Sequence, residues 1–470
     1  MLIGREKEQQ ELQNILESNQ SEFVAVFGRR RVGKTYLIRE FFHNEFDFYH
    51  TGIANEDSKS QLNAFNYSLN QFGKKKYPKK NNWFDAFRQL RDLLENIAPS
   101  GKKVVFIDEM PWMDTPKSGF VSALEFFWNS YASAQKDIIF IVCGSASSWI
   151  VKKLLNNHGG LHNRVTSQIH LNQFSLKECE MFFSANGIVL NRHQIAESYM
   201  IFGGIPYYLS LLKKQYGLSQ NVDLLCFNST GKLVNEFENL YASLFRNCEN
   251  HIAIVNALST KIKGLTRQEI IDITHIQEGG NLTNVLKELE ISGFIKKYKS
   301  FGKKERDVLY QLVDFFTLFY YNFMHGKNNN DENFWTNFSE NAKHRAWSGY
   351  AFEQVCLAHI RQIKQKLSIG GMISNISSWR YADSESGAQI DLVIDRTDKI
   401  INLCEVKYSN SLFTIDKNYD ENLRNRKELF REKTKTTKAL HLTMLTTYGI
   451  KHNEYYNNIQ SEIILDDLFQ

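Results

Sequence analysis

The stretch Gly28-Arg29-Arg30-Arg31-Val32-Gly33-Lys34-Thr35 fits the phosphate-binding pattern G-x-x-x-x-G-K-[ST] at every defined position. The apolar, β-branched segment 23–27 before it predicts a buried parallel strand, and the segment 36–42 after it has helical spacing. Glycines let such a loop curl, so that successive backbone N–H groups point inward at a phosphate chain. The order of strand, glycine loop and helix therefore predicts a nucleotide-binding loop, and it disfavours a chance match in a glycine turn.

The residue types of the loop assign roles within it. Lys34 is expected to reach the β- and γ-phosphates of ATP, and the Thr35 hydroxyl is expected to bind Mg²⁺. The other residues expected to line the phosphates are Gly28, Arg29, Arg30, Arg31, Val32, Gly33 and Tyr36. The start of the following helix adds partial positive charge to the same place.

A second apolar strand, 102–109, ends in two carboxylates. Asp108 at its tip is expected to hold the Mg²⁺ shell, as a P-loop NTPase requires. Glu109 is expected to polarise the attacking water as general base. The alternative is that the acidic pair only caps the next helix, but the phosphate loop upstream favours the catalytic interpretation.

The segment 138–143 predicts a further apolar strand. An extra strand between the phosphate loop and the glutamate-bearing acidic strand indicates an NTPase with an added central strand and a catalytic glutamate. Ser145 at its tip either senses the γ-phosphate or caps the next helix. Arg164 either neutralises transition-state charge, on its own nucleotide or on that of a neighbour in a homo-oligomer, or forms a structural salt bridge. Ile3 and Arg5 are candidates for the adenine pocket, with simple helix packing as the alternative.

Length and composition place limits on the whole chain. Its 470 residues predict roughly three or four domains, and 42% hydrophobic with 23% charged residues is ordinary for a folded protein. Charges interrupt every apolar run, so no membrane span and no signal sequence is expected. The six cysteines form no C-x-x-C pair, which fits a reducing cytoplasm and argues against a zinc site. The net charge of +5 says little about nucleic acid.

The order of predicted elements indicates an α/β P-loop NTPase with a parallel sheet and a helical lid, followed by a winged helix and a C-terminal α/β nuclease-like domain. The expected parts are an ATPase core at 1–174, a lid at 175–247, a winged helix at 248–312, a helical connection at 313–340 and the last domain at 341–470. The winged helix is expected to carry a basic turn at 302–306. Such a unit either reads DNA or contacts protein.

The last domain holds a second set of polar residues. Glu353 lies on a predicted helix, Asp391 opens a predicted strand, and Glu405 and Lys407 share one face of the partner strand. Asp391 and Glu405 are expected to bind Mg²⁺ or Mn²⁺, with Lys407 activating water and Glu353 adding a contact, as in D…E-x-K nucleases. The alternatives are a nuclease-like fold that does not cut and an ordinary charged hairpin. The residues of a basic stretch that either holds a phosphate backbone or faces solvent are Arg424, Arg426, Lys427, Arg431, Lys433, Lys435 and Lys438.

Together these motifs resemble the archaeal-type P-loop ATPases, often placed in the STAND class, fused to a C-terminal domain of unknown function with a restriction-endonuclease-like PD-(D/E)xK fold. The matching segments are 4–6, the phosphate loop, 107–109, 143–145, 203–206, and Asp391 with 405–407. The resemblance implies ATP as the nucleotide, an AAA-like conformational switch driven by ATP, and links to DNA handling or defence against foreign DNA. It does not identify the biological process.

Overall fold

The computed structural model divides the chain into two compact units, Met1–Gln173 with Leu244–Arg246, and Phe174–Ser243 with Asn247–Gln470. Residues 175–247, predicted as a lid, thus fall almost entirely in the second unit, and the finer subdivisions named above stay predictions. The structure describes residues 2–98, 101–145, 147–156, 159–161, 163–245, 247–299, 301–302, 308–326, 331–338, 341–382 and 387–470.

The first unit is built on a parallel sheet with strand order β2-β3-β4-β1-β5. The prediction of an α/β fold with a parallel sheet is confirmed, and β4 lies between the phosphate-loop strand β1 and the acidic strand β3, as expected. The three central strands β3, β4 and β1 are buried along almost their whole length because helices cover the sheet, whereas the edge strands β2 and β5 are partly exposed. The strands are β1 Glu22–Phe27, β2 Phe48–Thr51, β3 Lys103–Asp108, β4 Ile138–Gly144 and β5 Ser167–His170.

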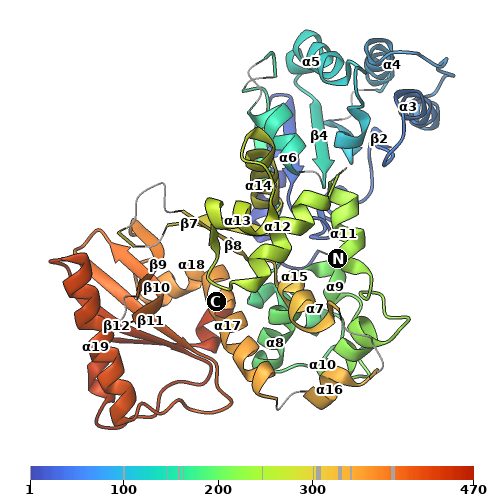
Figure 1. Ribbon diagram of the computed structural model, residues 1–470. Coiled ribbons are helices and arrows are strands. Elements are labelled where there is room, and N and C mark those ends of the chain that lie inside the picture. The colour runs from blue at the N-terminus through green and yellow to red at the C-terminus, as the bar shows by residue number, and fades with distance from the viewer. Residues whose placement is uncertain are drawn as a thin grey trace. The chain divides into compact units, whose positions relative to one another are not determined.

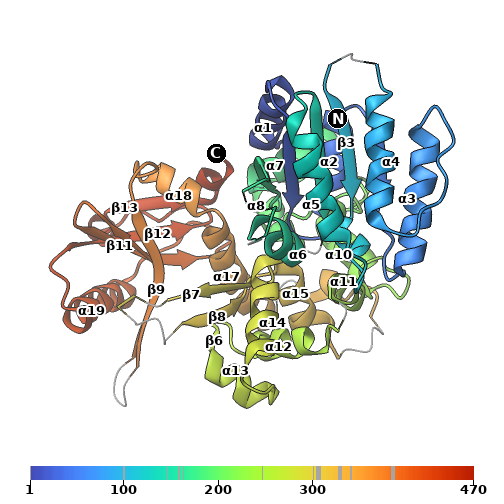
Figure 2. The same cartoon turned by 90° about the horizontal axis from the view of Figure 1, so that it is seen from above.

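Aromatic side chains fill the core of this unit. Phe23 of β1 lies 4.9 Å from Trp128 and 5.3 Å from Phe140, measured between ring centroids. Figure 2 shows α3 and α4 side by side, and both contribute to the same core. Asp57 and Asn82 cap these two helices through their side chains, which fixes where each begins. The main helices are α1 Glu6–Glu17, α2 Lys34–Phe41, α3 Ser58–Phe72, α4 Trp83–Glu95, α5 Phe120–Ser130 and α6 Ser147–Ile150.

The phosphate loop joins β1 to α2. Glycine is required at two of its positions, for a different physical reason at each. Gly28 has φ +145°, and a Cβ there would lie 2.2 Å from the carbonyl oxygen of Leu171. Gly33 has φ +94° and precedes the first residue of α2. Only glycine adopts both conformations without strain, so the loop geometry depends on these positions.

The second unit begins with short helices and continues into a small antiparallel sheet of order β6-β8-β7. Thr266 and Glu269 form a capping box at the start of α13, which fixes where this helix begins. The pair Leu265–Thr266 just before it also forms strand β6, which the sequence pattern does not predict. The elements are α7 Leu176–Ala185, α8 Arg192–Phe202, α9 Pro206–Leu209, α10 Leu218–Val222, α11 Glu236–Leu244, α12 Glu249–Thr260, β6 Leu265–Thr266, α13 Arg267–Thr274, α14 Gly280–Ile291, β7 Ile295–Tyr298, β8 Leu309–Leu312, α15 Phe315–Phe319 and α16 Phe334–Phe338.

Two expectations fall partly on undescribed residues. The basic turn expected at 302–306 lies, apart from its first residue, outside the described residues. The same holds for 327–330 and 339–340 within the predicted connection. Within the parts of the chain that the structure describes, no helix combines the length and apolar character needed to cross a bilayer.

The chain ends in a mixed sheet of order β13-β12-β11-β10-β9. Strands β9, β10 and β11 pair antiparallel, whereas β11, β12 and β13 pair parallel. Figure 1 shows α19 along this sheet, where Leu423 and Phe430 join its core, and α17 contacts β11. The elements are α17 Ala342–Ala358, α18 Ile360–Lys366, β9 Ser374–Ala382, β10 Gly387–Arg396, β11 Ile400–Lys407, α19 Lys417–Thr434, β12 Ala439–Thr446 and β13 Ser461–Ile464.

One local prediction in this sheet is wrong. The strand expected to begin at Asp391 begins at Gly387, because 387–390 pair with β9. The ladder is irregular between Ile390 and Val393, so Asp391 lies at a β-bulge. A bulge re-aims a side chain away from the regular alternation of the strand.

Candidate nucleotide site and C-terminal carboxylate cluster

Lys34 lies at the centre of the phosphate loop. Its Nζ donates hydrogen bonds to the carbonyl oxygens of Gly28 and Arg29, each at 2.9 Å. The side chain is 5% exposed, and burial lowers the pKa of its amino group. The loop thus holds an ammonium group inside its own curve, where a phosphate chain could take over the two hydrogen bonds.

Thr35 and Asp108 are joined directly, although 73 residues separate them. The Thr35 hydroxyl donates to Asp108 Oδ2 at 2.7 Å, and the backbone N–H of Glu109 donates to Asp108 Oδ1 at 2.9 Å. Burial, with the nearby Glu109, raises the pKa of Asp108. A hydroxyl and a carboxylate side by side supply the oxygen ligands that Mg²⁺ prefers, so the residues present fit this ion.

Glu109 and Ser145 connect the tips of β3 and β4. The Ser145 hydroxyl donates to Glu109 Oε1 at 2.5 Å, and its backbone N–H donates to Oε2 at 3.1 Å. Glu109 has a left-handed backbone, φ 45°, just before the short 3₁₀ helix Met110–Met113. This turn directs the carboxylate at β4, so both of its oxygens are held by one serine.

Three further side chains support the loop. Ser147 accepts a hydrogen bond from the Gly28 N–H and donates to the Gly28 carbonyl, both at 3.1 Å. Arg5 donates from Nη2 to the Val32 carbonyl at 3.2 Å. The His170 ring stacks on Phe27 at 5.0 Å, and burial together with Lys34 lowers the pKa of His170. Ser147 lies in the serine-rich segment directly after β4, so its position in the sequence could have suggested a role at the loop. No local sequence feature identifies His170.

The other predicted loop residues differ in exposure. Arg29 is buried, Arg30 and Arg31 are half-buried, and Tyr36 is 52% exposed. Arg164 is exposed in the turn before β5. Because Val24 pairs with Ser167 in parallel, Arg164 lies at the edge where β1 begins, whereas the phosphate loop follows the end of β1. The structure therefore does not bring Arg164 together with Lys34.

In the second unit, Glu353 and Asp391 share one lysine. Nζ of Lys263 lies 2.7 Å from Glu353 Oε2 and 3.4 Å from Asp391 Oδ1. Asp391 Oδ1 also accepts from Gln389 Nε2 at 2.8 Å, and Oδ2 accepts from the Val406 N–H at 3.5 Å. Burial and the neighbouring Asp391 raise the pKa of Glu353 to about 7.

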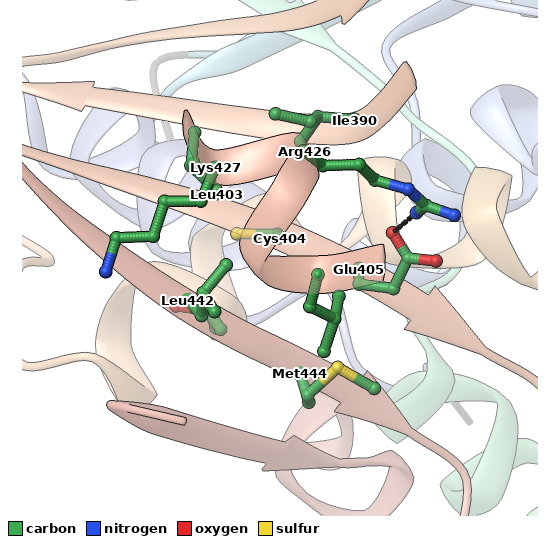
Figure 3. Close-up of a pocket in the computed structure, with 10 residues that line it drawn as sticks. Ile390, Leu403, Cys404, Glu405, Arg426, Lys427, Leu442 and Met444 are labelled. Carbon is green, nitrogen blue, oxygen red and sulfur yellow. Dashed lines mark hydrogen bonds and ion pairs between the residues drawn. The ribbon is translucent and has the colours of Figure 1, made fainter. Parts of the chain in front are cut away.

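Glu405 has its own set of partners. Oε1 lies 3.0 Å from Lys407 Nζ and accepts from the Tyr419 hydroxyl at 2.9 Å, while Oε2 lies 2.8 Å from Arg426 Nη1. Figure 3 shows the Arg426 side chain reaching Glu405, with Lys427 pointing elsewhere. Burial opposes ionisation of Glu405, but Lys407 and Arg426 outweigh it and hold its pKa below the usual range.

Glu353, Asp391 and Glu405 form the C-terminal carboxylate cluster. Each of these carboxylates is already paired with a lysine or arginine of the protein. Across the described ranges, no group of three or more His, Cys, Asp or Glu side chains is arranged to hold a metal ion. Glu353, Asp391, Glu405 and Lys407 are predicted from the sequence, whereas Lys263 and the hydroxyl of Tyr419 are not. Lys263 is 90 residues from Glu353 and 128 from Asp391, and no local pattern signals contacts of that separation.

Comparison with known proteins agrees with the fold of the first unit. Residues 2–212 match a family described as an ATPase domain predominantly from Archaea, and residues 315–423 match one described as Archaea bacterial proteins of unknown function. An uncharacterized protein of Methanocaldococcus jannaschii is 23% identical over 418 residues, which cover 87% of this chain and 88% of that protein.

Two similar solved structures are a Walker-type ATPase of Pyrococcus abyssi and the ORC2 protein of Aeropyrum pernix in ADPNP–ADP complexes. The first is 18% identical, covers 67% of this chain and 95% of its own, and has a TM-score of 0.47. The second is 14% identical, covers 66% and 90%, and has a TM-score of 0.40. By the family matches, residues 2–212 are similar to an ATPase domain, and residues 315–423 are similar to a group of unknown function.

Proposed function

We propose that this chain binds and hydrolyses ATP with Mg²⁺ in its first unit. The observation that supports this most strongly is the connected set at the strand tips. Lys34 lies inside the loop, Thr35 is hydrogen-bonded to Asp108, and Glu109 is hydrogen-bonded to Ser145. These are the groups that a phosphoryl transfer to water requires. They lie at or beyond the carboxyl ends of the neighbouring strands β1, β4 and β3, with Lys34 and Thr35 opening α2.

Each group has one role in this proposal. Lys34 exchanges its two carbonyl partners for the β- and γ-phosphates and stabilises their charge. Thr35 and Asp108 would hold Mg²⁺, which when bound neutralises charge on the transferred phosphoryl group. Glu109 accepts a proton from the attacking water once its carboxylate leaves Ser145. Ser145 holds Glu109 in the resting state and becomes available to the γ-phosphate when Glu109 turns.

The direct test uses the purified full-length chain. Calorimetry with ATP and Mg²⁺ should show saturable uptake at the micromolar level, and phosphate release should require the metal. Addition of a chelator is the control and should stop release while the protein stays folded by circular dichroism. Folded protein that takes up no ATP would rule the proposal out.

A second candidate function is metal-dependent cutting of DNA or RNA by the last domain, which would have a nuclease-like fold. ATP hydrolysis in the first unit would then act as a conformational switch coupled to this domain. The supporting observation is that Glu353, Asp391, Glu405 and Lys407 come together around β10 and β11. The elements β6 to β8 with α12 to α14 would then form a winged helix that binds nucleic acid. A non-cleaving ATP-dependent regulator that binds DNA or protein, acting in the cytoplasm, uses the same elements without cutting.

Asp391→Asn is expected to lower the rate of DNA or RNA cleavage by at least about 100-fold, because it removes the negative charge of one metal ligand. The chain is incubated with Mg²⁺ or Mn²⁺ and several DNA and RNA substrates, with and without ATP. The control is Asp395→Asn on the same strand, which pairs instead with Lys438 and should cut like wild type. Wild type that cuts no better than Asp391→Asn would leave the regulator as the function of this domain.

A further inference from the structure

A cavity in the second unit has more basic than acidic residues on its walls. Its volume is about 150 Å³, and its walls come from the turn before β6, from β7 and β8, from α17, and from β9 and β10. This space holds several water molecules, at about 30 Å³ each. Among the described residues that border it, the charged ones are Lys261, Lys263, Lys296, Arg380, Glu353 and Asp391.

The two acidic residues of the wall are already bound by a cation of the protein. Nζ of Lys263 lies 2.7 Å from Glu353 Oε2 and 3.4 Å from Asp391 Oδ1. These three groups together carry at most one negative charge. Lys261 pairs with Glu269, which opens α13 and does not border the cavity. The charge of the cavity therefore depends on its two remaining basic residues.

Those two residues, Lys296 and Arg380, are exposed at the border of the cavity. Within the ranges that the structure describes, neither side chain has an ion pair or a hydrogen bond. Lys296 shares a face of β7 with Tyr298, and Arg380 shares a face of β9 with Ser378. The Phe301 N–H donates to the Ser378 carbonyl at 2.8 Å, which joins the chain after β7 to β9. Two cations without a described counter-ion thus border one cavity from two sheets.

The wall between these strands and α17 is held by hydrogen bonds. The Ile262 carbonyl accepts from the Tyr350 hydroxyl at 3.0 Å and from Gln311 Nε2 at 3.1 Å. The Lys263 carbonyl accepts from the Tyr298 hydroxyl. Side chains of α17, β7 and β8 therefore fix the turn before β6, and the cavity exists without a ligand to shape it.

The residue types on the wall select the chemistry of an occupant. The planar guanidinium of Arg380 can donate two parallel hydrogen bonds to a phosphate group, and the Lys296 ammonium adds a point charge. Ser377 also borders the cavity, and its buried hydroxyl has no hydrogen-bond partner among the described residues. Leu309 and Leu357 supply apolar surface. Because pockets for larger ligands usually exceed about 300 Å³, the occupant that fits is a small one.

We propose that this cavity binds a small phosphate-bearing molecule, whose phosphate group Lys296 and Arg380 hold. The molecule is inorganic phosphate or a compact phosphate monoester, since both present the same oxygen atoms and negative charge. A nucleic-acid strand is not the proposed occupant, because a cavity of this volume encloses only a small group. The site lies in the second unit, and it depends neither on ATP hydrolysis by the first unit nor on cleavage by the last domain.

The test uses the full-length Lys34→Ala protein as reference, so that the phosphate loop lacks its ammonium group. Calorimetry with inorganic phosphate and with phenyl phosphate should show saturable binding of at least one of them, with a dissociation constant of about 1 mM or lower. Tighter binding of phenyl phosphate identifies a monoester site, and tighter binding of inorganic phosphate identifies a site for the free ion. Lys296→Met and Arg380→Met, each added to the reference, should weaken binding by about tenfold or more.

The matched controls are Lys287→Met on α14 and Arg361→Met on α18, which change exposed basic residues away from the cavity wall. Both should bind the probes like the reference. Folded reference protein that binds neither probe at about 10 mM would overturn the proposal, and so would binding that Lys296→Met and Arg380→Met leave unchanged. A single-stranded DNA oligonucleotide that binds through these two residues, while neither small probe binds, would assign them to a nucleic-acid surface instead. ATP turnover of wild type is measured separately, so failure here leaves the proposed ATPase untouched.

Discussion

Lys34→Ala is expected to abolish measurable ATP binding at micromolar protein and to lower phosphate release by at least about 100-fold. The ammonium of Lys34 lies inside the loop, where it donates to the Gly28 and Arg29 carbonyls. Its removal takes away the cation that the proposal assigns to the β- and γ-phosphates, in a buried site where electrostatic interactions are strongest. Calorimetry measures the binding loss, and a coupled assay measures phosphate release.

The control for this variant is Lys59→Ala, which removes an exposed lysine on α3 of the same unit. It should bind and hydrolyse ATP like wild type. Thermal unfolding of both variants separates a chemical defect from a folding defect, because Lys34 also ties the loop together. A folded Lys34→Ala protein with the wild-type rate would contradict the proposed nucleotide site at its centre.

The first unit was predictable because its signals are local. The phosphate loop is a contiguous pattern, and the strands that become β1, β3 and β4 are short continuous apolar runs bounded by polar residues. The carboxyl ends of parallel strands meet at one edge of a sheet, so residues at the tips of these runs come together. The contacts Thr35–Asp108 and Glu109–Ser145 follow from this rule, although 73 and 36 residues separate the partners.

The limits of the same rule are visible in Arg164. It comes before its strand and not after it, so a parallel register carries it to the opposite edge of the sheet. The sequence already places Arg164 before this strand, but it does not show with which strand β5 pairs or in which direction. The parallel pairing with β1 decides the position of the side chain.

In the C-terminal carboxylate cluster, only the residues on the hairpin of β10 and β11 could be predicted to lie together. Glu405 and Lys407 share one face of β11, and the antiparallel partner β10 brings Asp391 close. The β-bulge at Asp391 turns this residue toward Lys263 and Glu353, and a bulge has no sequence signature here beyond an ordinary β-branched run. Strands β9 and β13 and the short β6 were missed because their residues mix polar and apolar types without clear alternation.

Glu109→Gln is expected to lower ATP turnover by about 10²- to 10⁴-fold while leaving ATP binding close to wild type, the range for loss of a general base. Glutamine keeps the size of the side chain and one oxygen that accepts from Ser145, but it cannot take a proton from water. Single-turnover phosphate release measures the chemical step, and calorimetry measures binding in the same preparation.

A loss of ATP turnover without a loss of ATP binding distinguishes a catalytic Glu109 from a Glu109 that only holds the ends of β3 and β4 together. If Glu109 served structure alone, the buried Ser145 contact would weaken and binding would fall together with turnover, because the tips of β3 and β4 carry both Asp108 and Ser145. Glu95→Gln, which changes an exposed carboxylate paired with Arg91 on α4, is the charge-matched control and should alter neither quantity. Turnover within a factor of about three of wild type in folded Glu109→Gln would assign the general base to another group, since loss of a positioned base costs far more.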